Sequence, residues 1–311
     1  MLRLIARKVV LILLLLPALN YVGYLYATIH PNLFGSVFGV VVPLTEVESD
    51  YGRYLQNLLS GDLGQVGNQS VASIIGDPIK HSLVLVGVAI FVAILVGFLL
   101  GLLAISPRTK RMSPQGLLII SAGASMPGFI LGGAALSFMV YQTLSGGKSG
   151  TLLPISGYGL DAHLILPVII LAIQPTMYIA KVTANLLENE LQQDYVRVAR
   201  SKGLSWMRLL WSHAMPNMIS PVLLTISESL RLIVGALVIV EAIFIWPGIG
   251  RIFLFTIGLR LDGRSPSTFF GHPELLAAIV VVLGAMLLFS DLFINLLSYW
   301  LDPRLAAQTN E

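Results

Sequence analysis

Six apolar runs, each about as long as a bilayer is thick, constrain this chain more than any other feature. A helix needs roughly 20 apolar residues to cross the hydrocarbon core of a membrane. Runs of that size, bounded by charged residues or by Gly and Pro clusters, cover 9–29, 82–105, 116–144, 164–187, 218–246 and 275–301. We therefore predict an all-α membrane protein with about six transmembrane helices.

The composition supports this fold class and excludes others. Hydrophobic residues make up 56% of the chain and charged residues only 11%, whereas soluble domains carry about 25% charged residues. So few charges cannot build the clustered basic face that phosphate binding needs, and no nucleic-acid partner is expected. The chain has no cysteine, which excludes disulfides, thiolate nucleophiles and thiolate metal ligands.

The first apolar run follows Arg3, Arg7 and Lys8, a pattern that signal peptides share. Its length of about 21 residues, and the lack of a clear small-residue cleavage site after it, favour an uncleaved anchor. With the N-terminus inside, most of the 19 Lys and Arg residues fall in inside segments. The positive-inside rule then predicts that both termini lie in the cytoplasm.

The predicted spans divide the chain into four parts. These are the cytoplasmic N-terminus with the first helix (1–29), an external segment (30–81), a region of five helices (82–304) and a cytoplasmic tail (305–311). The external segment is too short for a sizeable independent domain and is expected to form a small cap. A cytoplasmic loop, 185–217, joins the fourth and fifth spans.

No motif predicts catalysis. The five His residues lack metal-binding spacing, and no G-x-S-x-G elbow is present. Leu144-Ser145-Gly146-Gly147-Lys148 resembles the LSGGQ signature of ABC ATPases, but the chain has no G-x-x-x-x-G-K-[ST] loop to hold phosphate. We expect no enzyme activity, no metal and no cofactor on this chain.

The loop after the fourth run carries the most informative pattern. Asp194 can cap a helix over 195–202, and Gly203 is a typical residue at a helix C-terminus. The basic face of this helix does not suit hydrocarbon and fits either anionic headgroups or an acidic groove on a partner. Charge alone leaves a third interpretation open, a basic loop that only follows the positive-inside rule.

The spacing within this loop is similar to the EAA loop of ABC importer permeases. In that loop E-A-A is followed after three residues by Gly, and nine residues later by I-x-L-P; Ala199, Gly203 and Pro216 match in register. The strings A-R-S-K-G-L and H-A-x-P-N resemble the class that imports peptides and nickel. The resemblance implies that the residues coupling to an ATPase are Asp194, Tyr195, Arg197, Val198, Ala199, Arg200, Lys202, Gly203 and Pro216.

Further motifs follow in the order typical of this family. They are Ser60-Gly61-Asp62-Leu63-Gly64, Leu153-Pro154 with Gly157-Tyr158, the string E-A-I-F-I-W-P-G-I-G-R over 241–251, and Leu301-Asp302-Pro303-Arg304. The G-D-P triplet that often follows the first span is replaced by His30-Pro31-Asn32. The external cap is therefore expected to differ from that of the family.

The resemblance implies a permease subunit of an ATP-driven importer in the cytoplasmic membrane. Its implied partners are a second homologous permease, two ATPases that carry ATP and Mg²⁺, and an extracellular or periplasmic solute-binding protein. The implied substrate is a di- or oligopeptide, with nickel complexes, glutathione or glycosides as alternatives. An ion-coupled secondary transporter is the alternative from a different class.

Ionisable residues inside the apolar runs are candidates for the translocation path. Glu228 and Arg231 lie three residues apart, on one helix face, and can neutralise one another. Because charges at bilayer depth usually face a pathway or a partner, these two and Glu241 are expected to line the path. The alternatives are a pair that only holds helix packing and, for Glu241, snorkelling to water. Met126-Pro127 and Gln174-Pro175 are expected to bend their helices.

Overall fold

The structure, a computed structural model, describes residues 2–34, 50–145, 153–154, 156–259 and 272–301. Five of the helices described there are long and apolar enough to cross a membrane, or six if one bent pair counts as a span. They are α1 (Leu2–Phe34), α3 (Val71–Leu103), α6 (Ile165–Leu191, after the 3-10 turn η1, Ala162–Leu164), α9 (Met215–Ile243) and α11 (Pro273–Leu301), with α4 (Pro114–Ser125) and α5 (Gly128–Ser145) as the bent pair. The predicted all-α membrane fold is confirmed.

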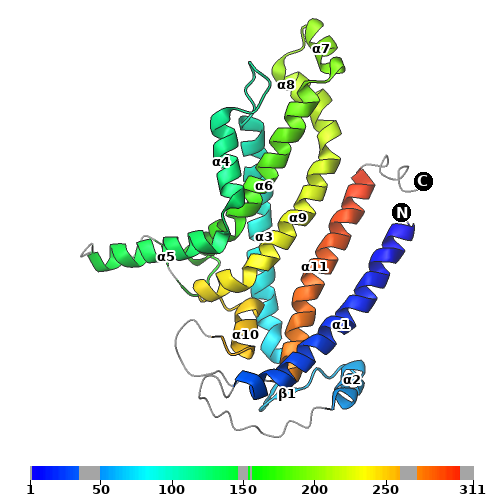
Figure 1. Cartoon of the computed structure of the whole chain (residues 1–311), viewed down its shortest axis with the longest axis vertical. Helices are drawn as coiled ribbons and strands as arrows, with labels where there is room; N and C mark the ends of the chain where they lie inside the picture. The colour runs from blue at the N-terminus through cyan, green and yellow to red at the C-terminus, as the bar shows by residue number, and fades with distance from the viewer. Residues whose placement is uncertain (1, 35–49, 146–152, 155, 260–271, 302–311) are drawn as a thin grey trace.

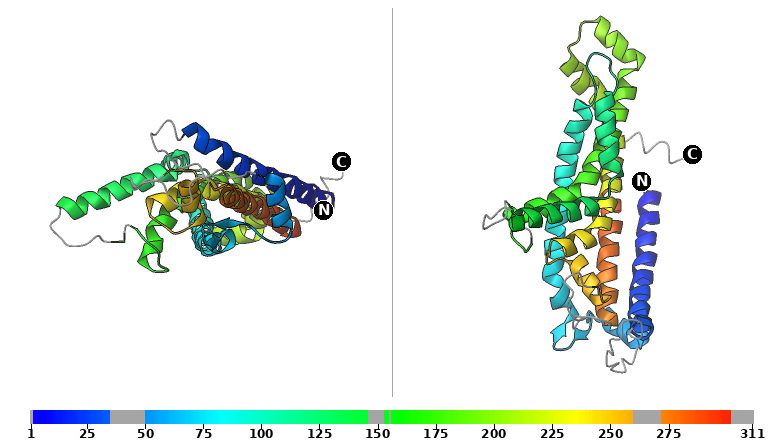
Figure 2. Two further views of the ribbon diagram at one scale, coloured as in Figure 1. Left: turned by 90° about the horizontal axis from the view of Figure 1, so that it is seen from below. Right: turned by 60° about the vertical axis from the view of Figure 1, so that its left-hand side comes forward.

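The third apolar run is the one that bends most sharply. Its two halves, α4 and α5, meet at 90°. Pro127 has no N–H to donate and disfavours a helical residue before it, and Met126 accordingly has an extended backbone (φ −88°, ψ 120°). α5 therefore projects sideways from the bundle (Figure 1, Figure 2). Pro175, in contrast, lies inside the continuous helix α6.

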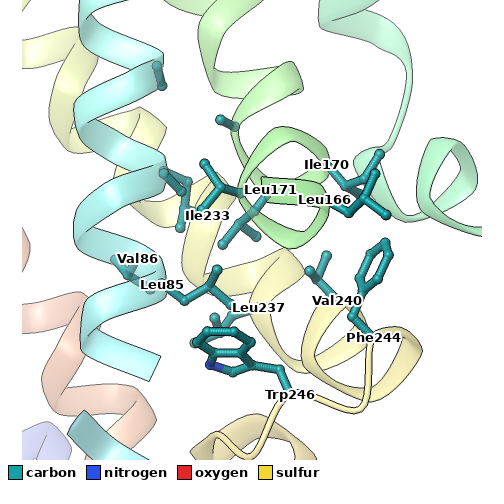
Figure 3. Packing of buried hydrophobic residues seen from close by; sticks show 14 of the residues in the cluster. Leu85, Val86, Leu166, Ile170, Leu171, Ile233, Leu237, Val240, Phe244 and Trp246 are labelled. Atoms are coloured by element: carbon teal, nitrogen blue, oxygen red, sulfur yellow. The ribbon is translucent and has the colours of Figure 1, made fainter. Parts of the chain in front are cut away.

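The centre of the bundle is one buried apolar cluster shared by α3, α6 and α9 (Figure 3). It brings together Leu85 of α3, Leu171 of α6, Leu237 of α9 and the loop residue Trp246, each at most 2% exposed. In a membrane the packing of such side chains, rather than their removal from water, holds helices together.

Two glycines allow α3 and α6 to pack closely. A Cβ at Gly97 would lie 2.6 Å from the carbonyl oxygen of Thr176, and one at Gly101 would lie 2.8 Å from that of Ala180. Real Cβ atoms do not approach backbone oxygens so closely, so only glycine permits this separation. Small residues spaced by four are the usual means of close helix contact in membranes.

The two ends of the molecule carry different short elements (Figure 1). One, the α2 end, holds α2 (Tyr51–Leu59), the hairpin of β1 (Gln65–Val66) and β2 (Gln69–Ser70), and α10 (Ile249–Thr256). The opposite one, the α7 end, holds α7 (Asp194–Ser201), α8 (Trp206–Leu209) and the π-helical turn η2 (Leu210–Ala214). The predicted tail 305–311, Asp302–Arg304 of the terminal motif and Gly146–Lys148 of the signature-like string lie outside the described residues.

Candidate functional site

α7, the helix after the fourth span, lies at the tip of the molecule (Figure 1). It ends before Gly203, whose left-handed backbone (φ +79°) terminates the helix as predicted. Gln193 occupies the N-cap position, so the predicted cap at Asp194 is displaced by one residue. Asp194 lies in the first turn and pairs with Arg197 (Nη1 to Oδ1, 3.3 Å), where its charge complements the helix dipole.

α7 has one buried face and one exposed face. Val196 and Ala199 are buried in an apolar cluster with Leu187 and Leu191 of α6. Its exposed side chains, together with that of the residue that follows the helix, include Arg197, Val198, Arg200 and Lys202. Val196 and Ala199 therefore pack the helix against α6. Its cations face outward, where a partner or a lipid surface can contact them.

Three polar side chains, which we call the α7 clasp, join the base of α7 to both flanking spans. Glu190 of α6 accepts hydrogen bonds from the Tyr195 hydroxyl and from Nδ2 of Asn217 in the first turn of α9, the latter at 2.6 Å. Asn217 also donates to the Tyr195 oxygen at 3.3 Å. Burial and the bond to Glu190 raise the pKa of Tyr195 to about 12. The hydroxyl thus stays protonated and donating at neutral pH.

Sequence reasoning named Tyr195 but missed the other two members of the clasp. Asn217 stood in the H-A-x-P-N string, so a signal for it existed. Glu190 is one of several polar residues at the end of α6, and no local pattern distinguishes it. Pro216, the last predicted coupling residue, lies in the first turn of α9, where its missing N–H costs no hydrogen bond.

Four charged side chains form a network between α1, α9 and α11. Asp291 of α11 pairs with Lys8 of α1 and with Arg231 of α9 (Oδ1 to Nη2, 2.8 Å). Arg231 also pairs with Glu228, as the sequence predicted, and the Ser227 hydroxyl donates to Asp291 at 3.0 Å. Asp291, which sequence reasoning gave no role, is the centre of the network.

We expect Asp291→Asn to lower the thermal stability of the protein clearly. The Asp291 side chain is 14% exposed and compensates two cations. Breaking a buried ion pair costs about 3–5 kcal/mol. Because the Lys8 and Arg231 side chains are 31% and 50% exposed, a loss of about 2 kcal/mol is more realistic here. Thermal unfolding of the purified complex in detergent measures it.

Glu228→Gln is the matched control for this prediction. It also removes one carboxylate from Arg231, but from a pair whose side chains are 44% and 50% exposed. Exposed pairs contribute at most about 1 kcal/mol. Equal destabilisation by the two substitutions would contradict the central position of Asp291.

One face of α9 is open between residues 224 and 239. Its residues recur every three or four positions; Leu224, Arg231, Gly235 and Ile239 are exposed, and Glu228 is half-buried. A Cβ at Gly235 would meet no atom within 4 Å. This face, which we call the α9 stripe, therefore combines an accessible ion pair with open space beside it.

The exposed face of α3 offers a comparison within the same chain. Phe91, Leu95 and Leu99 are 66%, 51% and 49% exposed, and all are apolar. Such a face suits lipid. The α9 stripe does not, because an accessible ion pair at bilayer depth needs water or a polar partner.

Glu241 lies away from the α9 stripe. Its side chain is fully buried, and it accepts hydrogen bonds from the backbone N–H groups of Gly250 (2.7 Å) and Arg251 (3.2 Å) and from the Ser82 hydroxyl (2.5 Å). It thus caps the start of α10 and ties it to α3. A carboxylate so enclosed neither lines a surface nor reaches water, so the structure gives Glu241 a capping role in place of the predicted one.

The corner between α9 and α10 is held against α3 by further contacts. The Trp246 indole N–H donates to the carbonyl oxygen of His81 at 3.2 Å, and the His81 ring donates to that of Pro247 at 3.0 Å. Ile245 has a left-handed backbone (φ +54°), which is strained for a β-branched residue. The surrounding bonds therefore hold the corner in a shape that the backbone does not prefer.

Comparison with known proteins identifies the family of this chain. Residues 93–307, well over half of the chain, match the family described as binding-protein-dependent transport system inner membrane component. This chain belongs to that family. It is therefore a multi-pass inner-membrane permease subunit of an ABC importer and not an enzyme, with the ATPase on separate subunits. A solute-binding protein and an ATPase are the partners that the family implies.

Relatives of this permease span most of its length. The dipeptide transport system permease protein DppB of Bacillus subtilis is 28% identical over 82% of this chain and 78% of that protein. DppB of Alkalihalophilus pseudofirmus is 28% identical over 82% of this chain and 80% of that protein. A Brucella abortus protein, provisionally named a peptide transport system permease protein, is 32% identical over 67% of this chain and 68% of that protein.

The family match covers most of the features described above. It begins inside α3, so the α7 clasp, the α9 stripe and Asp291 belong to the matched region. α1, α2 and Lys8 lie before it. The Lys8–Asp291 pair thus joins the first helix to the part of the chain that the family match covers.

Proposed function

We propose that this permease imports di- or oligopeptides, and that α7 is the helix on which its ATPase acts. The observation that carries the proposal is the geometry of α7, a helix at the tip of the molecule with an exposed basic face and a buried face of Val196 and Ala199. The names of relatives that span most of the chain support peptides as the substrate.

The α7 end is proposed to lie in the cytoplasm, together with both termini. The start of α1 and the end of α11 both lie toward that end (Figure 1), and the distribution of Lys and Arg agrees with the positive-inside rule. The proposed assembly contains a second homologous permease, two ATPases and one external solute-binding protein. ATP and Mg²⁺ belong to the ATPases in this proposal and supply the energy there.

Two connections would carry a displacement of α7 into the membrane. The chain joins α6 to α7 through only two residues, Gln192 and Gln193. The α7 clasp joins the same point to the first turn of α9 through Glu190 and Asn217. Because α6 and α9 are attached to α7 at one place, movement of α7 shifts the ends of both spans together.

The α9 stripe is the proposed wall of the substrate path, with Glu228 and Arg231 as its charged residues. Its accessible ion pair favours a water-filled path over lipid. The two charges of opposite sign leave no net charge to repel a zwitterionic peptide. Glu241 is not part of this wall, because it is enclosed within the chain.

Cysteine accessibility tests the path, since the chain has no native cysteine. We expect Gly235→Cys, in the complete transporter in a lipid bilayer, to react with a charged, membrane-impermeant thiol reagent. Leu95→Cys, on the equally open apolar face of α3, should react at least about tenfold more slowly, because the reactive thiolate forms only in water. Equally slow reaction at both sites would show that lipid or protein covers the α9 stripe.

Transport by the reconstituted complex tests the function itself. The permease pair, both ATPases and the solute-binding protein in proteoliposomes are expected to take up a labelled dipeptide only with ATP. Competition by glutathione, nickel complexes or glycosides, with no effect of peptides, would replace the substrate class. Uptake that continues with inactive ATPases and follows an ion gradient would establish the secondary-transporter alternative.

A further inference from the structure

The connection between α3 and α4 is a tight hairpin, 105–112, rather than an open loop. Ile105 and Met112 pair as an antiparallel bridge. The Ser106 N–H donates to the carbonyl oxygen of Arg111 at 3.0 Å, and the Lys110 N–H to that of Ser106 at 2.8 Å. Lys110 closes the turn with a left-handed backbone (φ +58°), which residues other than glycine seldom adopt.

The hairpin is also fixed to the body that carries α7. The Met112 N–H donates to Oε2 of Glu188 in α6 at 3.0 Å, two residues before the Glu190 of the clasp. Ile105 lies in the same buried apolar cluster as Val196 and Ala199 of α7. The hairpin and α7 thus share one packed core and one helix end.

The hairpin adds three cations to the basic face of α7. Arg108 and Arg111 are exposed, and Lys110 is half-buried. Burial lowers the pKa of Lys110, and the guanidinium groups of Arg200 and Arg197 lower it further. Lys110 therefore lies within electrostatic reach of Arg197 and Arg200. Because the hairpin and α7 also pack on the same apolar cluster, their cations gather at one end of the molecule, and we treat them as one basic surface.

The described acids nearby neutralise only part of this surface. Asp194 pairs with Arg197 at 3.3 Å, and Glu188, which accepts the Met112 N–H, adds a second negative charge. Among the described residues no ion pair is formed by Arg108, Lys110, Arg111 or Arg200, so the surface keeps an excess of positive charge. Like charges held side by side repel, and the rigid hairpin keeps them there. A fixed arrangement of cations suits a fixed pattern of carboxylates, whereas fluid lipid headgroups require no such rigidity.

We infer that the 105–112 hairpin is a second contact of this permease with its ATPase, and that Arg108, Lys110 and Arg111 bind an acidic surface beside the groove that receives α7. The inference rests on the proposed function of α7. It adds a contact from a second loop, the one that connects α3 and α4. The ATPase would then hold the ends of α3, α4 and α6 together.

Charge reversal in the assembled transporter tests this contact. We expect Arg108→Glu with Arg111→Glu to weaken binding of the ATPase to the permease complex at least about tenfold at low salt, with the difference shrinking at high salt. Arg108→Lys with Arg111→Lys should retain most of the binding. Lys80→Glu, an exposed cation on the other half of α3, should have no effect. The measurement is ATPase binding to nanodiscs of phosphatidylcholine alone.

Each other outcome has a definite meaning. Unchanged binding by the doubly reversed variant, while Arg197→Glu with Arg200→Glu on α7 weakens it, overturns the hairpin contact and leaves the proposed function standing. An effect seen only when phosphatidylglycerol is present assigns the hairpin to anionic lipid and also overturns the inference. If neither pair of substitutions weakens binding, the proposed role of α7 itself is wrong.

Discussion

Replacing Ala199 with glutamate should abolish peptide uptake while ATP can still be hydrolysed. Ala199 is only 7% exposed and packs against the apolar cluster under α7. A glutamate there must either lose its water, at a cost of several kcal/mol, or lift α7 from its seat. We expect uptake, and the stimulation of ATPase activity by the loaded binding protein, to fall at least about tenfold. Uptake is measured in proteoliposomes, and ATPase activity is measured by the release of phosphate.

Two companion variants separate coupling from assembly. Ala199→Ser changes the volume and polarity at this position only slightly and should keep most of the activity. Gly203→Ala adds a Cβ that meets no neighbour but places alanine at φ +79°, which costs about 1 kcal/mol. It should loosen the end of α7 and reduce coupling while the complex still assembles. Full transport by Ala199→Glu would refute the role of α7.

Replacing Glu241 with alanine should cause the largest loss of stability among the predicted substitutions. It leaves three donors without their acceptor, namely the Ser82 hydroxyl and the N–H groups of Gly250 and Arg251. A buried donor without a partner costs about 1–3 kcal/mol, so a total of about 3 kcal/mol or more is expected. The strained Ile245 in the same corner would no longer be held (φ +54°). Thermal unfolding of the purified complex measures the loss.

The control for this prediction keeps the shape of the side chain. Glu241→Gln retains one acceptor oxygen and nearly the same volume, so it should cost clearly less than alanine. Glu228→Ala, on the accessible α9 stripe, removes a carboxylate without orphaning a buried donor and should cost at most about 1 kcal/mol. A melting temperature for Glu241→Ala no lower than that of Glu228→Ala would show that the cap is dispensable.

The fold class and the position of α7 could be predicted because both depend on local pattern. The length and spacing of the apolar runs indicate membrane helices whatever their neighbours are, since lipid requires every backbone polar group to be paired within its own helix. Gly203 ends α7 because the residue suits the left-handed backbone there. The Glu228–Arg231 pair was visible because residues three apart share one face of a helix.

Other features required the packed structure. Glu190 and Asn217 lie 27 positions apart and meet at 2.6 Å, and Lys8 and Asp291 pair although 283 positions separate them. Such contacts depend on how helices pack, and no local pattern encodes that. For the same reason the enclosed position of Glu241 was missed, because a carboxylate near the end of a span gives no local sign of whether another helix will cover it.

The loop after the fourth span shows the division most clearly. The amino-acid sequence alone predicted a short basic helix there, because charge, capping and spacing are properties of neighbouring residues. The attachment of that helix to two spans, and the presence of a second basic element beside it, arise where α3, α6 and α9 come together. Those helices are brought close by Gly97, Gly101 and the apolar cluster between them, and that packing is set by contacts between residues far apart in the sequence.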